Sequence, residues 1–187
     1  MIENINNNIE KLSFTIETPK EGDEVGIGQA HKQAWSETYM NPKDGITEEV
    51  INDLIGHVAE EEGNDYRKNI FNEASVAPEK ILYRVIKNNN GKIVGFMHCT
   101  KEEEYNELGG LYLLDEAKGA GLGGRLMEEF LAWADKGRPC QLEVFASNEN
   151  AIGFYTKYGF KKTDKPAEHW KGKLDLIVMV RPVESID

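Results

Sequence analysis

The sequence is poor in the features that mark several classes of protein. It has only two cysteines, Cys99 and Cys140, which give neither a disulfide framework nor the spacing of a metal site. No apolar run is long enough to span a bilayer, and the first residues lack the apolar core of a signal peptide. Basic residues number 22 against 33 acidic ones, a formal net charge of -11. We therefore expect a cytoplasmic protein without metal, nucleic-acid or membrane partners, because the last two need a basic surface.

The length of 187 residues suits one domain that can bury a core without disulfides or metals. The asparagine-rich start gives no element signal, and neither a repeat nor a long linker divides the rest. We expect a loose leader over 1–12, one domain over 13–182 and a short tail over 183–187.

The first half of the chain favours helices after one short strand. Alternation predicts a strand over 14–18, and apolar spacing predicts a helix from Asp23 to Tyr39. Its expected buried side comprises Val25, Ile27, Ala30, Ala34 and Trp35. Thr47 with acidic residues behind it predicts a second helix over 47–58. The charged segment 60–78 indicates only some helix near 66–74 and a break at Pro78.

The second half changes to strand patterns interrupted by two helices. An Asn-Gly turn predicts a hairpin over 80–100, and a strand over 106–114 contains Gly109-Gly110, which suggests a bulge or a close backbone approach. Helices are expected after the glycines at 119–124 and over 148–158, and strands over 139–146 and 173–182. The order predicts an α/β or α+β fold around a sheet of mixed direction.

Four glycines lie between a predicted strand and a predicted helix, at Gly119, Gly121, Gly123 and Gly124. Bare backbone at a helix N-terminus is suited to phosphate groups. A P-loop is excluded because Arg125-Leu126 follows Gly124 where Lys-Ser/Thr is required. A dinucleotide fingerprint matches literally, with Glu143 as its acidic residue, but the motif begins at residue 119 with only one β-α-β unit behind it. Both alternatives are weaker than a third one.

Two motifs resemble those of the GNAT acetyltransferase superfamily. The family's [Gln/Arg]-x-x-Gly-x-[Gly/Ala] loop corresponds to Lys118, Gly121 and Gly123, with lysine replacing the usual arginine or glutamine. The stretch "NENAIGFYTKYGF" resembles the family's Asn-x-x-Ala-x-x-Phe-Tyr-x-Lys-x-Gly-Phe segment over 148–160. The resemblance covers about residues 14–181. It implies a mixed, mostly antiparallel sheet of about seven strands flanked by helices, with a splayed pair of parallel strands that binds coenzyme A.

The resemblance implies acetyl-CoA as cosubstrate and assigns residues to it. Backbone groups of Leu111, Tyr112 and Leu113 would pair with the pantetheine arm in the gap between strands 107–114 and 140–146. Asn148 would bond the pantetheine or ADP portion, or cap the helix that follows it. The pyrophosphate would lie on the loop of Lys118, Gly119, Ala120, Gly121, Leu122, Gly123, Gly124 and Arg125.

The resemblance also assigns two catalytic candidates. Tyr155 would act as general acid and protonate the leaving thiolate, with a packed aromatic as the alternative. Glu107 would act as general base through water, with an exposed carboxylate at a strand end as the alternative. His98 and Cys99 are neighbours on a strand and point to opposite faces, which disfavours a Cys-His nucleophile pair.

The function that follows is transfer of an acetyl group from acetyl-CoA to a primary amine by direct attack in a ternary complex. The alternative is a non-catalytic acyl-CoA-binding or sensing module of the same fold. Trp35, Glu37 and Tyr39 lie where the family walls the acceptor site, although core packing suits Trp35 better. The segments 36–80 and 163–173 would shape that site without revealing the acceptor, so a polyamine, a drug, an amino acid and a protein N-terminus stay open. The charge favours a small cationic amine, and homodimers are common in the family.

Overall fold

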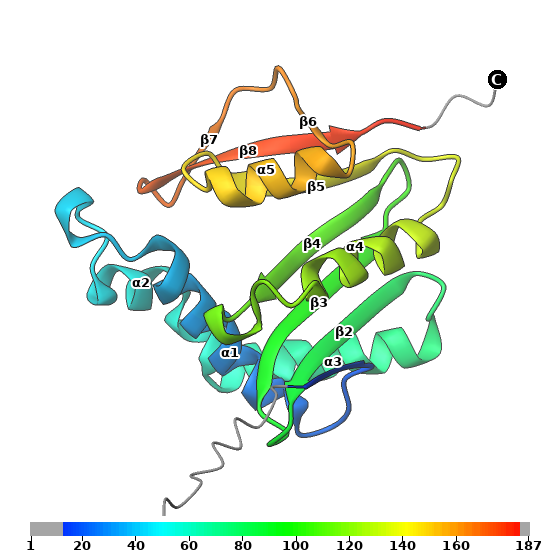
Figure 1. Cartoon of the computed structure of the whole chain (residues 1–187), viewed down its shortest axis with the longest axis horizontal. Coiled ribbons are helices and arrows are strands. Elements are labelled where there is room, and N and C mark those ends of the chain that lie inside the picture. Colours follow the sequence, from blue (N-terminus) through cyan, green and yellow to red (C-terminus); the bar gives the residue numbers. More distant parts are fainter. Residues whose placement is uncertain (1–12, 184–187) are drawn as a thin grey trace, which may run out of the picture.

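The computed structural model describes residues 13–183, and these form one mixed sheet with helices on both faces (Figure 1). The strands are β1 (Phe14–Glu17), β2 (Ile81–Asn88), β3 (Ile93–Lys101), β4 (Asn106–Leu113), β5 (Cys140–Phe145), β6 (Lys161–Lys162), β7 (Glu168–Trp170) and β8 (Leu174–Arg181). Their order is β1-β2-β3-β4-β5-β8-β6, with β7 also paired to β8. Only β4 and β5 pair in parallel, so the expected mixed, mostly antiparallel sheet is confirmed, with eight strands where about seven were expected.

The helices are α1 (Asp23–Tyr39), α2 (Glu48–Ile55), α3 (Glu61–Val76), α4 (Leu122–Trp133) and α5 (Glu149–Lys157). Short 3-10 turns are η1 (Pro42–Asp44), η2 (Gly56–Ala59) and η3 (Asp115–Ala117). The bounds of α1 match the prediction, and the Thr47 hydroxyl caps α2 by accepting from the amide of Val50 at 3.3 Å. The expected leader 1–12 lies outside the described residues, as does the tail beyond residue 183.

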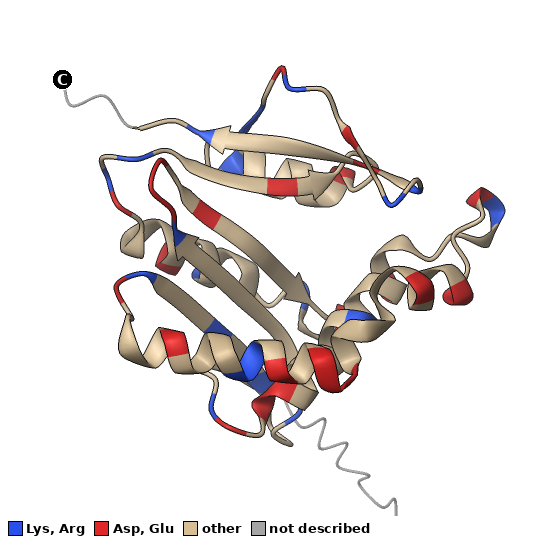
Figure 2. Cartoon of the chain, turned by 180° about the vertical axis from the view of Figure 1, so that it is seen from behind, with Lys and Arg blue, Asp and Glu red and all other residues tan. Residues whose placement is uncertain are grey.

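The two faces of the sheet have separate apolar cores. On one face, Leu126, Met127 and Phe130 of α4 are fully buried against β2, β3 and β5. On the other face, Ile27 of α1 and Ile70 of α3 pack on β2 and β3. Figure 1 shows α4 and α5 in front of the sheet, and Figure 2 shows α1 and α3 covering the opposite side. The prediction that Val25 is buried was wrong: it is 44% exposed, because it lies two residues before Ile27, off the stripe that faces the sheet.

The parallel pair β4–β5 is held together at one end only. The side-chain amide of buried Asn106 donates to the carbonyls of Asp135 and Arg138, and its oxygen accepts from the Asp135 amide at 2.8 Å. The pairing between β4 and β5 covers only three residues of β4, Asn106 to Leu108. Beyond them the two strands diverge (Figure 1). The expected splayed pair is therefore present.

A bulge in β4 marks the point of divergence. On the β3 side, Cys99 pairs with Leu108 and His98 pairs with Gly110, so Gly109 is the extra residue. A β-bulge bends its strand and increases the local twist. Of the two alternatives suggested by Gly109-Gly110, a bulge or a close backbone approach, the bulge is confirmed, and it lies where β4 leaves β5.

Candidate active site

A large groove of about 1210 Å³ occupies the space between the diverging strands. Its walls come from β4, from the carboxyl end of β5, from α5 and its preceding loop, and from the end of α1. Strand β8 closes it with Leu174 and Leu176. The predicted residues that line it are Leu111, Tyr112, Leu113, Lys118, Gly123, Asn148 and Tyr155.

At the mouth of this groove, the backbone amides of Gly119 to Gly124 have no hydrogen-bond partner among the described residues. Gly119 and Gly121 have φ values of 79° and 76°, the left-handed region that side chains rarely adopt. Gly121 is the N-cap residue of α4, and no side chain caps that helix. Its first turn also contains no acidic residue. The N-terminal amides and the helix dipole therefore make a suitable site for a diphosphate.

The other loop residues have distinct surroundings. Lys118 pairs with Asp115 at 2.6 Å on the surface, so its ammonium group lies beside the loop. A Cβ on Gly123 would lie 3.5 Å from Leu113 and 3.6 Å from Phe154, which are ordinary van der Waals distances, so this position has room for a small side chain. Ala120 and Arg125 are exposed, whereas Leu122 is buried in the core beneath α4. Leu122 can therefore contribute only its backbone to a ligand.

The free edge of β4 faces the groove. Leu111, Tyr112 and Leu113 pair with β3 on one side, whereas β5 pairs with β4 no further than Leu108. This leaves backbone donors and acceptors of Gly109 to Leu113 along the groove without a strand partner. An extended arm with amide groups can pair with such an edge as an added strand does.

Tyr155 lies in α5 and lines the groove from the side of β5. The residue is only 8% exposed, with the rings of Phe154 and Phe160 at 5.4 and 6.2 Å. Burial raises the pKa of its phenol above the ordinary value, because a phenolate would be poorly solvated there. The hydroxyl is therefore protonated at neutral pH, the state that a general acid needs.

Asn148 has the capping role that the sequence left open. Its side-chain oxygen accepts from the Ala151 amide at 3.1 Å, and its side-chain NH2 donates to the Tyr39 hydroxyl at 3.1 Å. The bond to Tyr39 ties the end of α1 to the start of α5 across the groove. Burial raises the pKa of Tyr39 to about 12. A contact of Asn148 with a cofactor stays a prediction.

Glu107 is half-buried on β4 and does not line the groove. Its carboxylate accepts a long hydrogen bond from the Thr100 hydroxyl at 3.4 Å. Burial raises its pKa, as do the charges of Glu102 and Glu143. Glu143 does line the groove, and Figure 2 shows an acidic position on each of the two strands beside the gap. The structure thus places Glu107 in an acidic group beside the gap.

The three residues that the family resemblance places at the wall of the acceptor site, Trp35, Glu37 and Tyr39, do not lie together. Glu37 and Tyr39 line the groove, and the Glu37 carboxylate accepts from the Asp115 amide at 2.8 Å just before the glycine loop. Trp35 is instead a core residue, 3% exposed and in ring contact with Phe145 and Trp170. Leu174 and Leu176 were missed, because only the pairing of β8 with β5 brings them to the groove.

Within residues 13–183, the cysteines are both buried and the potential metal ligands form no cluster. Cys99 and Cys140 are free and buried, and burial raises the pKa of both thiols. Residues 13–183 contain no group of three or more His, Cys, Asp or Glu that could hold a metal ion. Over the same residues, no helix combines the length and the apolar character needed to cross a membrane.

A family model for the acetyltransferase (GNAT) family matches residues 30–160, which include the glycine loop, the splayed strands and Tyr155. The chain belongs to this family. It is an acetyltransferase that uses acetyl-CoA as cosubstrate. A search of curated protein sequences found no match.

Solved structures of GNAT acetyltransferases share the fold. PaiA N-acetyltransferase from Thermoplasma acidophilum, in complex with coenzyme A, is 23% identical, with a TM-score of 0.69 over 89% of this chain and 98% of its own. An acetyltransferase of the GNAT family from Streptococcus pneumoniae is 20% identical, with a TM-score of 0.66 over 92% and 100%. Ard1 from Thermoplasma volcanium is 22% identical, with a TM-score of 0.60 over 92% and 99%.

Proposed function

We propose that the protein transfers the acetyl group to a small primary amine by direct attack in a ternary complex. The observation that carries this proposal is the groove between β4 and β5, which joins the uncapped N-terminus of α4 to the buried phenol of Tyr155. One end suits a diphosphate and the other suits a proton donor. Acetyl-CoA has a diphosphate at one end and a reactive thioester at the other, joined by an extended amide-bearing arm.

In this proposal the chain holds acetyl-CoA mainly through its backbone. Amides from Gly119 to Gly124 would bind the pyrophosphate, and Lys118 and Arg125 would add positive charge beside it. The free edge of Leu111 to Leu113 would pair with the pantetheine amides, and an amide at the bulge would polarise the thioester carbonyl. Asn148 would bond the arm while it caps α5.

The proposed reaction needs three proton transfers, one to Glu107 and two through Tyr155. The acceptor arrives as an ammonium and gives one proton to Glu107 through water. The neutral amine attacks the thioester carbon, the carbon–sulfur bond breaks, and the thiolate takes the proton of the Tyr155 hydroxyl. The second proton of the attacking nitrogen returns to the Tyr155 oxygen. The products are the amide and coenzyme A, with one proton left on Glu107 for release to solvent.

A covalent acetyl-enzyme is not part of the proposal. It would need an activated nucleophile in the groove. Both cysteines are buried outside the residues that line the groove, and burial keeps their thiols protonated. Direct attack by the amine requires no such residue.

We also propose a domain organisation, an oligomeric state and a cellular location. Residues 13–182 would form one catalytic domain, and a homodimer is part of the hypothesis because such dimers are common in the resembled family. The two free cysteines suit a reducing compartment, which supports a cytoplasmic location.

The test compares two tyrosines of the same segment. Tyr155→Phe removes the proposed acid, so kcat falls about 100-fold, the scale of general acid catalysis, while the Kd of coenzyme A stays the same. Tyr158→Phe is the matched control, because its ring packs on Phe154 and its hydroxyl lies beside Gly124, outside the residues that line the groove. Its kcat at saturating acetyl-CoA should stay at the wild-type value, since it cannot reach the thioester. Stopped assays of CoA release and calorimetric CoA binding supply the two readouts. Equal turnover of both variants would remove Tyr155 from the mechanism.

A further inference from the structure

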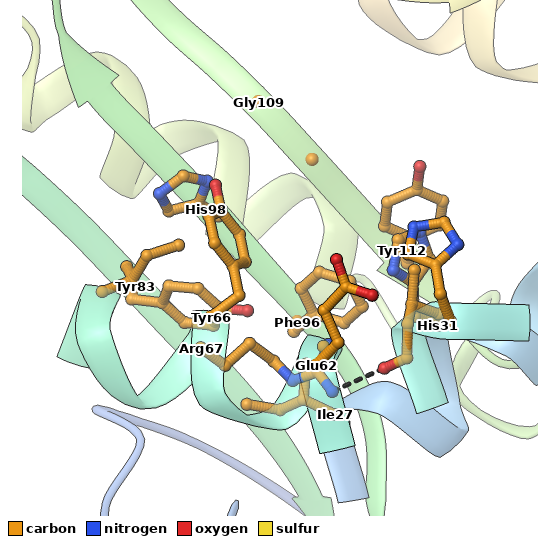
Figure 3. Close-up of a pocket in the computed structure, with 15 residues that line it drawn as sticks. Ile27, His31, Glu62, Tyr66, Arg67, Tyr83, Phe96, His98, Gly109 and Tyr112 are labelled. Atoms are coloured by element: carbon orange, nitrogen blue, oxygen red, sulfur yellow. Dashed lines mark hydrogen bonds between the residues drawn. The ribbon is translucent and has the colours of Figure 1, made fainter. Parts of the chain in front are cut away.

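A second cavity of about 440 Å³ lies on the other side of β4. Its floor is formed by β2, β3 and β4, and α1, η2 and α3 form its walls (Figure 3). It shares Gly109, Gly110 and Tyr112 with the groove described above. The two cavities therefore meet at the bulge, where β4 carries no side chain at two successive positions.

Aromatic rings dominate this second cavity. Phe96 and Tyr112 stack at 5.1 Å, Tyr83 stacks on Phe96 at 6.2 Å, and His31 lies 4.4 Å from Tyr112. The exposed ring of Tyr66 forms a further wall. Its volume falls within the range of about 300–1,000 Å³ found for small-molecule sites, which are mostly apolar with a few polar groups. Such walls suit an aromatic or compact apolar body.

Glu62 is the one carboxylate among the described residues that line the second cavity. It is exposed on α3, and Figure 3 shows its side chain directed into the space between Tyr66 and His31. Aromatic faces and a carboxylate together favour an organic cation. One carboxylate at the cavity is enough for one ammonium group.

Arg67 disfavours a second positive charge. Its guanidinium donates to the carbonyls of Glu24 and Val58 at 2.8 and 2.5 Å and to the side-chain oxygen of Asn64 at 2.8 Å. None of these partners is a carboxylate, so no carboxylate of the described residues contacts its charge. Burial lowers the pKa of Arg67, and the charges of Tyr83 and Glu24 offset this only in part. A diamine or polyamine would bring another cation towards this charge. The bound donors of Arg67 are equally unavailable to an acceptor's carboxylate.

His98 gives the cavity a polar contact beside the bulge. Its Nε2 is buried with no hydrogen-bond partner among the described residues, and a Cβ on Gly109 would lie 3.2 Å from its Nδ1. Burial lowers the pKa of His98, so the ring is neutral and keeps a lone pair. A neutral imidazole can accept a hydrogen bond from an ammonium without repelling it. Glu107 follows on the same face of β4, beyond the bulge from Tyr112.

We propose that the second cavity is the acceptor site and that it selects a primary amine with one positive charge and an aromatic or compact apolar body. Glu62 and His98 hold the ammonium beside Gly109, and the rings around Phe96 hold the body. This inference rests on the proposed function, because it places the amine opposite the thioester across the bulge of β4.

The experiment measures acetylation of four probes with saturating acetyl-CoA: phenethylamine, spermidine, L-phenylalanine and a peptide with a free N-terminus. Phenethylamine should have the highest kcat/KM of the four. A preference for spermidine would overturn the requirement for a single positive charge on the acceptor. A preference for L-phenylalanine would show that Arg67 binds the carboxylate of the acceptor, which would overturn its assigned role. Selective acetylation of the peptide would place the acceptor outside this cavity.

Two exposed carboxylates on one helix turn supply the matched variants. Glu62→Gln removes the carboxylate from the cavity, so the KM for phenethylamine rises about fivefold, the upper end of the scale for an exposed ion pair. Glu61→Gln leaves KM within twofold, because Glu61 is exposed on α3 and does not line the cavity. Equal KM values for both variants would overturn the placement of the ammonium.

The outcome separates this inference from the proposed function. Thermal stabilisation by acetyl-CoA should be the same in wild type, Glu62→Gln and Glu61→Gln. If acetyl-CoA stabilises all three and only another class of amine is acetylated, the acceptor inference fails and the proposed function stands. If acetyl-CoA neither binds nor is consumed with any amine, the proposed function itself fails.

Discussion

The two cavities that flank β4 are built from different parts of the chain. In the groove on the side of β5, the groups proposed to hold acetyl-CoA are largely backbone: glycine amides at the start of α4 and the free edge of one strand. The cavity on the other side is made of side chains from six elements between Ile27 and Tyr112. A binding site made of backbone amides requires glycines at fixed spacing, and this spacing is visible in the sequence as a motif. A side-chain pocket can be rebuilt from many residue types, which allows the cofactor to stay while the acceptor changes.

A substitution on the acceptor side should damage folding most. A Cβ on Gly28 would lie 2.4 Å from the Val58 carbonyl oxygen and 2.5 Å from Nη2 of Arg67. Gly28→Ala therefore forces α1, η2 and α3 apart and lowers the free energy of unfolding by about 3 kcal/mol, the upper end of overpacking costs. The KM for the amine should rise more than the Kd of coenzyme A, since the groove is built elsewhere.

Gly153→Ala is the control for this prediction. Gly153 is a helical glycine of α5 with no atom within 4 Å of an added Cβ, so alanine raises stability by about 0.5–1 kcal/mol. Urea denaturation of both variants measures the contrast. If Gly28→Ala and Gly153→Ala changed the free energy of unfolding in the same direction, the result would contradict the close packing of Gly28 against Val58 and Arg67.

A substitution between the two cavities should affect activity and stability in opposite directions. The raised pKa of Glu107 means that the folded protein holds this proton more tightly than the unfolded chain, so stability is lost as pH rises through that pKa. Glu107→Gln removes this cost and raises Tm at pH 7, with no gain below about pH 4. As loss of the proposed base, it lowers kcat/KM about 100-fold, the lower end of general base catalysis. A variant with wild-type turnover would leave Glu107 with a structural role only.

A substitution on the cofactor side should have the smallest effect and a different readout. Gly121→Ala forces a side chain into a φ of 76°, at a cost of about 1–2 kcal/mol, and weakens coenzyme A binding about fivefold as the amides shift. Gly91→Ala is the matched control, since Gly91 has a φ of 75° in the β2–β3 turn and open space around it. Both variants lose similar stability, and only Gly121→Ala loses affinity. Equal CoA affinity in the two would contradict the loop assignment.

The elements that could be predicted from the sequence are those with local sequence signals. Helix α1, the Thr47 cap, the hairpin, the bulge at Gly109 and helix α4 all have local signals: caps, turn residues, glycine pairs and apolar spacing. Only residues near 66–74 were expected to be helical in α3, which runs from Glu61 to Val76. Its charged first turn has few apolar residues, and the helix is stabilised by packing on α1 and η2.

The parts that were not predicted depend on distant contacts. Strands β6 and β7 have two and three residues, too few for any alternation, and exist because β8 pairs with them. Tyr155 and the glycine loop could be assigned through motifs. Glu62 and His98 could not, because α3 and β3 meet over Gly109 only in the folded chain. His98 was considered in the sequence only as a partner for Cys99.

The most direct test of the account is a crystal structure of the protein with coenzyme A and phenethylamine, a pair that cannot react. The account predicts the pyrophosphate on the amides of Gly119 to Gly124, the pantetheine along Leu111 to Leu113, and the sulfur within hydrogen-bond reach of the Tyr155 hydroxyl. The amine should enter from the side of Glu62 and His98. Coenzyme A bound outside the β4–β5 groove, or a sulfur far from Tyr155, would contradict the central claim.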